Sequence, residues 1–167
     1  NEGQNSTSNE NLELVDWLES NLENFDIVVV PDYGNGFITD SMTEVISRKS
    51  KFLAINTQIN SGNRGYHVVN RYNSANFISL NEPEIRLARH DLQDSVVELS
   101  KVTAKLLNAN FISVTQGPAG LYTYCANNDN SFKVPALSSN VVDRVGAGDA
   151  FLSISAICLD NTVVASK

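Results

Sequence analysis

The chain has 167 residues, of which 42% are hydrophobic and 19% are charged, and its formal net charge is −7. This length suits one globular domain, and an acidic chain with only 12 Lys and Arg residues excludes a nucleic-acid or membrane-surface binder that relies on basic charge. No apolar run reaches the ~20 residues of a membrane span, and two cysteines without metal-ligand spacing are typical of the reduced core of a cytoplasmic protein.

Two helices are predicted near the start of the chain. Residues 1–8 are polar and are expected to be a disordered start, so the domain is expected to occupy residues 9–167. The first helix is expected from Asn9, and its apolar stripe at helical spacing consists of Leu12, Val15, Leu18 and Leu22. Thr39 is a suitable N-cap for a second helix that ends at about Lys49.

Strands are predicted where short apolar, β-branched runs are bounded by polar segments. Three such runs, which we expect to be buried parallel strands, are residues 26–31, 52–56 and 76–80. A second group contains a fourth strand, an antiparallel strand that returns after a tight turn, and a short edge strand, at residues 111–115, 121–125 and 132–135.

Two further helices separate the third and fourth strands. The first begins at Asn81 and runs through Ala88. The second runs from about 94 to 108, and its expected apolar face consists of Val96, Val97, Leu99, Val102, Leu106 and Leu107. This alternation predicts an α/β layered sheet with right-handed crossovers, in which ligands bind at the carboxyl ends of the strands. The loops expected there are 32–36, 56–65, 81–84 and 115–120.

The most informative stretch is 143–151, where Gly146, Ala147, Gly148 and Asp149 precede an apolar helical run. Glycines let backbone N–H groups turn toward an anion, and the N-terminus of a helix adds a positive dipole. A carboxylate beside a bound phosphate is useful when a second substrate's hydroxyl lies between them, because it can accept that proton. The stretch therefore indicates phosphoryl transfer to an alcohol, although a glycine-rich turn before a buried helix would have the same pattern.

Two other segments at strand ends have both a structural and a functional interpretation. In residues 81–84, Asn81 can cap a helix and Glu84 favours the helix dipole, so the segment is a well-made helix start. Residues 115–120 contain Gly117 and Gly120, which suffice for a β-turn but also let a phosphate or ribose approach the backbone.

All three segments resemble motifs of the ribokinase-like (pfkB) carbohydrate kinases. The stretch 143–151 is similar to their C-terminal signature, Asp-Thr-x-Gly-Ala-Gly-Asp-x-Phe, and departs from it at Arg144, where the family usually has Thr or Ser. Residues 81–84 resemble the family's Asn-x-x-Glu motif, and residues 115–120 resemble its Thr-x-Gly-x-x-Gly motif. The three motifs also follow one another in the family's order.

The resemblance implies a three-layer α/β/α fold with a mostly parallel sheet, truncated at both ends because family members are nearly twice as long. It implies that Asp149 is the catalytic base and that the anion hole is formed by Gly146, Ala147 and Gly148. ATP would be bordered by Thr115, Gly117 and Gly120. Asn81 and Glu84 would organise Mg²⁺ and the phosphate oxygens, Glu84 through water.

The acceptor implied by the resemblance is a sugar or sugar phosphate, with a heptose phosphate as the first hypothesis. Asp32, in a segment similar to one in the heptose-phosphate kinases, would contact substrate or cap its loop. Asn56 and Arg64 lie in a polar loop suited to sugar hydroxyls or phosphate, or simply to solvent. Alternatives are a nucleoside kinase of the same fold and a non-catalytic nucleotide-binding or interaction module. A fragment of this kind could be inactive alone, and its exposed sheet edges would allow a homodimer.

Overall fold

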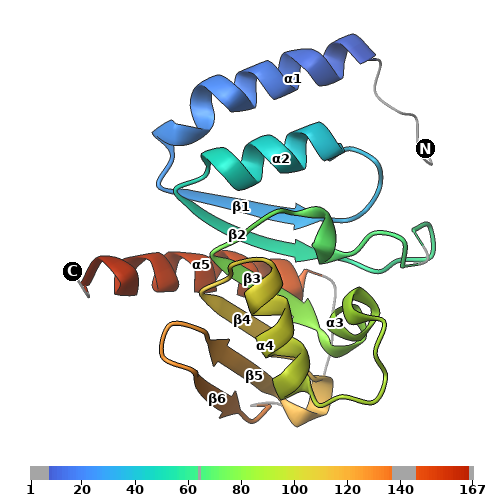
Figure 1. Ribbon diagram of the computed structural model, residues 1–167, viewed down its shortest axis with the longest axis vertical. Helices are drawn as coiled ribbons and strands as arrows, with labels where there is room; N and C mark the ends of the chain where they lie inside the picture. The colour runs from blue at the N-terminus through green and yellow to red at the C-terminus, as the bar shows by residue number, and fades with distance from the viewer. Residues whose placement is uncertain (1–7, 64, 137–145, 166–167) are drawn as a thin grey trace.

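The computed structural model describes residues 8–63, 65–136 and 146–165 (Figure 1). The helices in these ranges are α1 (Ser8–Asn21), α2 (Asp40–Lys49), α3 (Glu82–Arg89), α4 (Val96–Leu106) and α5 (Ala147–Ala165). The strands are β1 (Ile27–Asp32), β2 (Phe52–Thr57), β3 (Phe77–Asn81), β4 (Phe111–Thr115), β5 (Leu121–Cys125) and β6 (Asn130–Val134). Short 3₁₀ turns are η1 (Leu22–Asn24), η2 (Val69–Arg71) and η3 (Gly117–Ala119). Each strand lies within two residues of the one predicted.

The strands form one six-stranded sheet in the order β1-β2-β3-β4-β5-β6. β1 to β4 are parallel, with Val29 opposite Ala54 and Ile78 opposite Ile112, whereas β5 and β6 are antiparallel additions. The mostly parallel sheet is therefore confirmed. All five residues of β6 are exposed at the edge, and pairing with a second copy there stays a prediction.

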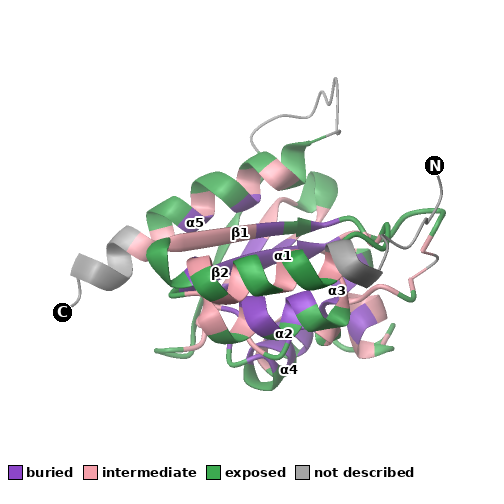
Figure 2. Ribbon diagram, turned by 90° about the horizontal axis from the view of Figure 1, so that it is seen from above, coloured by how far each residue is buried: buried purple, intermediate pink, exposed green. Residues whose placement is uncertain are grey.

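The sheet separates two apolar layers, which makes the architecture the expected α/β/α sandwich. Figure 2 shows α5 on one side of the sheet and α1, α2, α3 and α4 on the other. The larger core lies under those four helices and includes Leu53, Ile55 and Ile78. A smaller core lies under α5, where Leu152 and Ala156 pack near Phe52, Ala54 and Phe77. None of the helices in the described residues has the length and apolar character needed to cross a membrane.

The expected apolar face of α4 is partly wrong. Val102 and Leu106 are 43% and 54% exposed, whereas the hydroxyl residues Ser100 and Thr103 are fully buried. The helix turns its smaller side chains toward the sheet, and the Thr103 hydroxyl donates to the carbonyl of Leu99 at 2.7 Å, so its polarity is satisfied inside the helix. Two lesser expectations also fail, because Leu12 and Cys158 are exposed rather than buried.

We predict that docking of α5 depends on Leu152, which has no exposed surface, and not on Ile154, which is 65% exposed. Leu152→Ala should lower the free energy of unfolding by about 2–4 kcal/mol, because it removes buried methyl groups and leaves a cavity. Ile154→Ala is the matched control on the same helix and should change it by less than ~0.5 kcal/mol. Urea denaturation measures both, and equal effects would mean that α5 does not pack as described.

Candidate active site

The polar residues of interest gather at one edge of the sheet. β1 to β4 are parallel and end at Asp32, Thr57, Asn81 and Thr115, so their carboxyl ends lie at the same edge. α5 begins at that edge and runs back along the face of the sheet that α1, α2, α3 and α4 do not cover (Figure 1). The fold therefore brings the predicted loops together with the first turn of α5, as expected for this kind of sheet.

Asp149 lies in the first turn of α5 and is held by two side chains from other elements. The Tyr33 hydroxyl donates to Oδ2 of Asp149, and Nε2 of Gln58 donates to Oδ1 at 3.2 Å. The carboxylate is half-buried. Gly146 precedes it with a φ of +76°, and its carbonyl accepts the N–H of Ala150 at 3.0 Å, which starts the helix. The carboxylate is thus aimed by its helix and by two strand-end loops.

The two glycines of this segment differ in how far the fold explains them. Gly146 adopts a left-handed conformation that favours glycine. Gly148 lies in the helix with an ordinary φ. Apart from its chain neighbours and the backbone of its own helix, no atom of the described residues lies within 4 Å of the Cβ that another residue would add. Glycine weakens a helix, so packing in the described part of the chain gives no reason for Gly148. Asp143 and Arg144, at the start of the motif, lie outside the described residues.

Asn81 and Glu84 form the helix start that their sequence predicts. The Asn81 side chain accepts the N–H of Glu84 at 2.9 Å, and Oε2 of Glu84 accepts the N–H of Asn81 at 2.8 Å, which is a capping box. Burial raises the pKa of Glu84, while the N–H groups of Asn81 and Ile59 act in the opposite direction. Within residues 8–63, 65–136 and 146–165, no three His, Cys, Asp or Glu side chains gather closely enough to hold a metal ion.

The turn after β4 is tied to the start of α3. Nε2 of Gln116 donates to Oε2 of Glu82 at 2.9 Å, and this bond, followed by those from Arg86, lowers the pKa of Glu82. Gly120 has a φ of +92°, and a Cβ there would lie 2.1 Å from the carbonyl oxygen of Val134. Gly117 has a φ of +56°, and the described part of the chain leaves open space beside it. The predicted turn is confirmed, and Gly120 is needed for it.

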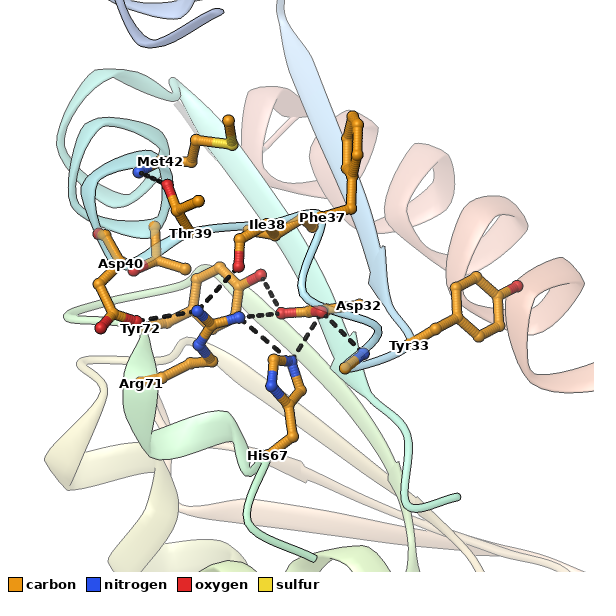
Figure 3. Close-up of polar contacts among 12 residues, drawn as sticks. Asp32, Tyr33, Phe37, Ile38, Thr39, Asp40, Met42, His67, Arg71 and Tyr72 are labelled. Atoms are coloured by element: carbon orange, nitrogen blue, oxygen red, sulfur yellow. Dashed lines mark hydrogen bonds and ion pairs between the residues drawn. The ribbon is translucent and has the colours of Figure 1, made fainter. Parts of the chain in front are cut away.

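Asp32 is buried, and each of its carboxylate oxygens accepts two hydrogen bonds (Figure 3). Oδ1 accepts the N–H of Gly34 at 3.1 Å and lies 2.7 Å from Nε2 of His67. Oδ2 accepts Nη1 of Arg71 at 3.0 Å and the hydroxyl of Tyr72 at 2.9 Å. Because a carboxylate only accepts, Nε2 of His67 must carry the proton in this contact. These four donors occupy the carboxylate, which favours the loop-capping role that the sequence left open.

Arg71 extends this network to the start of α2. Its Nη2 donates to the carbonyl of Ile38 and to Oδ1 of Asp40, both at 2.9 Å. Burial raises the pKa of Asp32, but the hydrogen bonds from His67 and Tyr72 outweigh it and hold that pKa below the ordinary value of 3.8. Asp32 therefore remains a charged partner for Arg71 at neutral pH.

The other predicted substrate residues differ in what the structure says of them. Asn56 is 5% exposed, and its Oδ1 has no hydrogen-bond partner among the described residues. Arg64 lies outside the described residues. Sequence reasoning missed the roles of Tyr33 and Gln58 beside Asp149, and of His67, Arg71 and Tyr72 around Asp32. The only available signal was position, because Tyr33 and Gln58 directly follow the last residues of β1 and β2.

We predict that Asp32→Asn destabilises the protein by roughly 3 kcal/mol at neutral pH, because it leaves the largely buried Arg71 without its buried carboxylate partner and with only the exposed Asp40. The pKa of Asp32 is lowered on folding, so its stabilisation is present above pH 3.8 and is lost as the pH falls below that value. The difference in unfolding free energy between wild type and Asp32→Asn should therefore shrink as the pH falls below 3.8.

The matched control is Asp40→Asn, which removes the other carboxylate on Arg71. The Asp40 side chain is 95% exposed, so this change should cost less than ~1 kcal/mol. Urea denaturation across a pH series measures both variants. A pH-independent difference for Asp32→Asn would contradict the buried ion pair.

Comparison with known proteins agrees with this geometry. A family model described as pfkB family carbohydrate kinase matches residues 2–162. The bifunctional protein HldE of Trichlorobacter lovleyi is 24% identical over 147 residues, which are 86% of this chain and 29% of that protein. A mutant phosphofructokinase-2 from Escherichia coli has a TM-score of 0.73 at 15% identity, with 93% of this chain and 50% of that one covered.

A further structure with this fold is the ribokinase of Arabidopsis thaliana complexed with ribose and ATP. Its TM-score is 0.61 at 19% identity, and the match covers 95% of this chain and 48% of that one. The chain thus spans less than a third of the HldE relative and about half of each kinase structure. The expected ribokinase-like fold is confirmed by these structures. Since the family model matches nearly the whole chain, the chain belongs to the pfkB family of carbohydrate kinases.

Proposed function

We propose that the protein transfers the γ-phosphoryl group of ATP to a hydroxyl group of a sugar or sugar phosphate, with Asp149 as the base. The observation that carries this proposal is the position of Asp149. Its half-buried carboxylate lies in the first turn of α5, at the sheet edge where ligands bind in such folds, and the described residues leave open space beside Gly146 and Gly148. Membership of the pfkB family and the ribose and ATP in one structure of this fold support it.

The reaction is an in-line displacement at phosphorus. The acceptor hydroxyl oxygen attacks the γ-phosphorus, and the bond from that phosphorus to the bridging oxygen breaks, so ADP leaves with the electron pair. The hydroxyl proton passes to Asp149. Tyr33 and Gln58 each donate to a different oxygen of this carboxylate, and an ionised carboxylate has about four acceptor sites, so acceptor capacity remains for the substrate.

The amides of Gly146, Ala147 and Gly148 are proposed to stabilise the transferring phosphoryl group. They lie at the N-terminus of α5, where backbone N–H groups lack helical partners and the dipole favours an anion. Among the described residues the space beside Gly146 and Gly148 is open, which would let phosphate oxygens approach the backbone. Donors fixed in advance need no reorganisation during the reaction.

The nucleotide is proposed to lie along the turn after β4. Thr115 ends β4, Gly117 has open space beside it, and Gly120 closes the turn. Magnesium bound with ATP supplies positive charge against the phosphate oxygens. The Glu84 carboxylate already accepts backbone N–H groups, and the Asn81 side chain caps the N-terminus of α3. These residues therefore fit a metal ion that is held through water rather than directly.

The acceptor is proposed to be a sugar phosphate, with a heptose phosphate as the first candidate. Support comes from the similarity to HldE and from the segment 32–36, although Asn35 stands where the heptose-phosphate kinases typically carry a basic residue. Asn56 remains a candidate contact because its buried Oδ1 is unpaired among the described residues, and Arg64 remains one by its loop position. For Asp32 we propose the role of capping its loop rather than contacting substrate.

We predict that Asp149→Asn lowers kcat by at least about 100-fold in the full-length gene product while Mg·ATP still binds, because an amide cannot accept the hydroxyl proton. ADP formation with a panel of sugars, sugar phosphates and nucleosides measures turnover, and calorimetry measures binding. The control is Asp26→Asn, a carboxylate 86% exposed before the amino end of β1. Turnover unchanged in Asp149→Asn would end the base assignment, and turnover only with nucleosides would favour a nucleoside kinase.

Gly148→Ala should separate the structural interpretation of the motif from the functional one. The substitution places a methyl group where the described residues leave open space, and it improves helix propensity, so stability should rise by up to ~1 kcal/mol. The same methyl group would obstruct a phosphate at the backbone, so kcat/KM should fall at least about 10-fold. Urea denaturation and the ADP assay measure the two effects. Higher stability with full activity would mean that no phosphate approaches this residue.

A further inference from the structure

The two side chains that bind the Asp149 carboxylate come from loops that touch each other. Tyr33 lies in the loop after β1, and Gln58 begins the loop after β2. Tyr33 donates to Oδ2 and Gln58 to Oδ1, so each oxygen of Asp149 has one donor. These contacts join residues 116 and 91 positions apart in the sequence. The carboxylate is therefore contacted from two sides by residues outside the three motifs at 81–84, 115–120 and 143–151.

The backbone of Tyr33 is fixed by an asparagine of the neighbouring loop. Its carbonyl accepts Nδ2 of Asn60 at 2.6 Å, and Nδ2 of Asn63 lies 3.4 Å from the same oxygen. The next residue, Gly34, has a φ of +65°, and a Cβ there would lie 2.4 Å from Nδ2 of Asn63. The two loops thus approach so closely that no larger residue than glycine fits at position 34.

The backbone of Gln58 is held by the same pair of loops. Its N–H donates to the carbonyl of Asp32 at 2.9 Å, which continues the β1–β2 ladder beyond Thr57. Its carbonyl accepts Nδ2 of Asn63 at 2.7 Å. Asn60 and Asn63 therefore anchor both of the residues that bind Asp149.

The two asparagines also fix each other, and we call this pair the asparagine clasp. Oδ1 of Asn63 accepts the N–H of Asn60 at 3.2 Å, and Oδ1 of Asn60 accepts the N–H of Asn63 at 2.8 Å. The same oxygens accept the N–H groups of Gly62 and Gly65, at 2.9 and 3.1 Å. Side-chain bonds of this kind hold a loop that has no helix or strand pairing of its own.

We propose that Tyr33 and Gln58 are positioning residues that orient the Asp149 carboxylate toward the acceptor hydroxyl, and that the asparagine clasp holds both of them in place. This inference rests on the proposed function of Asp149. One bond to each oxygen restricts rotation of the carboxylate while leaving acceptor capacity for the substrate. A base fixed in this way meets the hydroxyl in a reactive geometry more often.

The charge of Asp149 also keeps Tyr33 a donor. The hydrogen bond to Asp149 raises the pKa of the Tyr33 phenol, because a phenolate beside that carboxylate would be repelled. Tyr33 is 42% exposed, so its hydroxyl can be removed without loss of a packed core residue. A Phe variant therefore tests the contact and not the fold.

The kinetic test uses Tyr33→Phe and Gln58→Ala in the full-length gene product. Each should lower kcat roughly 10-fold, because a hydrogen bond to the charged Asp149 is lost. The KM for ATP should stay nearly unchanged, because neither variant alters the turn after β4 where the nucleotide is proposed to lie. A loss confined to kcat is what misorientation of Asp149 predicts, whereas a disturbed fold would also raise KM for ATP. Tyr66→Phe is the matched control, a tyrosine 94% exposed near the clasp.

The outcomes separate this inference from the function on which it rests. If Asp149→Asn keeps full turnover, the base assignment fails and the positioning role fails with it. If Asp149→Asn abolishes turnover while Tyr33→Phe and Gln58→Ala keep the wild-type kcat, only the positioning role is overturned. Equal losses in Tyr33→Phe and Tyr66→Phe would also overturn it.

A second readout measures the contact without any turnover. The chain has 5 tyrosines, and NMR of the labelled ring carbon that carries the hydroxyl follows each titration, with Tyr33→Phe identifying the signal of Tyr33. Tyr33 should titrate above pH 10.0 in the wild type and at lower pH in Asp149→Asn, because the repelling charge is gone. An identical titration in both proteins would overturn the contact.

The clasp is tested by Asn60→Ala, made alone and together with Tyr33→Phe. Alone it should lower kcat about fivefold, because the bond to the Tyr33 carbonyl is lost. In the Tyr33→Phe background the same change should have a smaller effect on kcat, since the Tyr33 hydroxyl that Asn60 helps to position is already absent. Equal fold-changes in both backgrounds would show that the clasp does not act through Tyr33.

Discussion

The buried ion pair between Asp32 and Arg71 is the constraint on which the arrangement of the site depends. It joins the end of β1 to η2 and, through the second nitrogen of Arg71, to the segment before α2. Gly34 donates to the same carboxylate, which turns the chain sharply after β1. Tyr33 lies between Asp32 and Gly34 in the chain, and its side chain points away from Asp32 and Arg71 and toward α5 (Figure 3). Unpairing such a charge would cost far more than an exposed salt bridge.

A second constraint is the apolar docking of α5 on the face opposite the other helices. Leu152 and Ala156 are fully buried against Phe52, Ala54 and Phe77, so they set how the helix lies on the sheet. Asp149 precedes Leu152 by less than one helical turn, and its height above the strand ends follows from that packing. Hydrophobic packing of α5 therefore places the Asp149 carboxylate, and side chains from two loops hydrogen-bond to its two oxygens.

The sequence predicted the layers and the positions of the strands well because those follow from local patterns. The apolar runs 27–30 and 52–55 both mark strands, although only β2 is fully buried and β1, at the sheet edge, is mostly partly buried. Thr39 and Asn81 mark helix starts that the structure confirms. The buried face of α4 was predicted wrongly because the pattern of apolar residues alone was used. The hydroxyl residues Ser100 and Thr103 take buried positions there. The partners of Asp149 and Asp32 were not predictable, because bonds such as that from Tyr33 join distant residues without any periodic signal.

The family motifs differ in how much of their sequence the fold itself requires. Asn81 and Glu84 complete a capping box, and Gly120 avoids a clash with a neighbouring strand, so stability alone would favour all three residues. Gly148 has no such reason among the described residues, and a carboxylate at position 149 needs only a favourable place near a helix N-terminus. Residues that the fold does not require are the more informative about chemistry. By that criterion, the start of α5 is stronger support for phosphoryl transfer than either of the other two motifs.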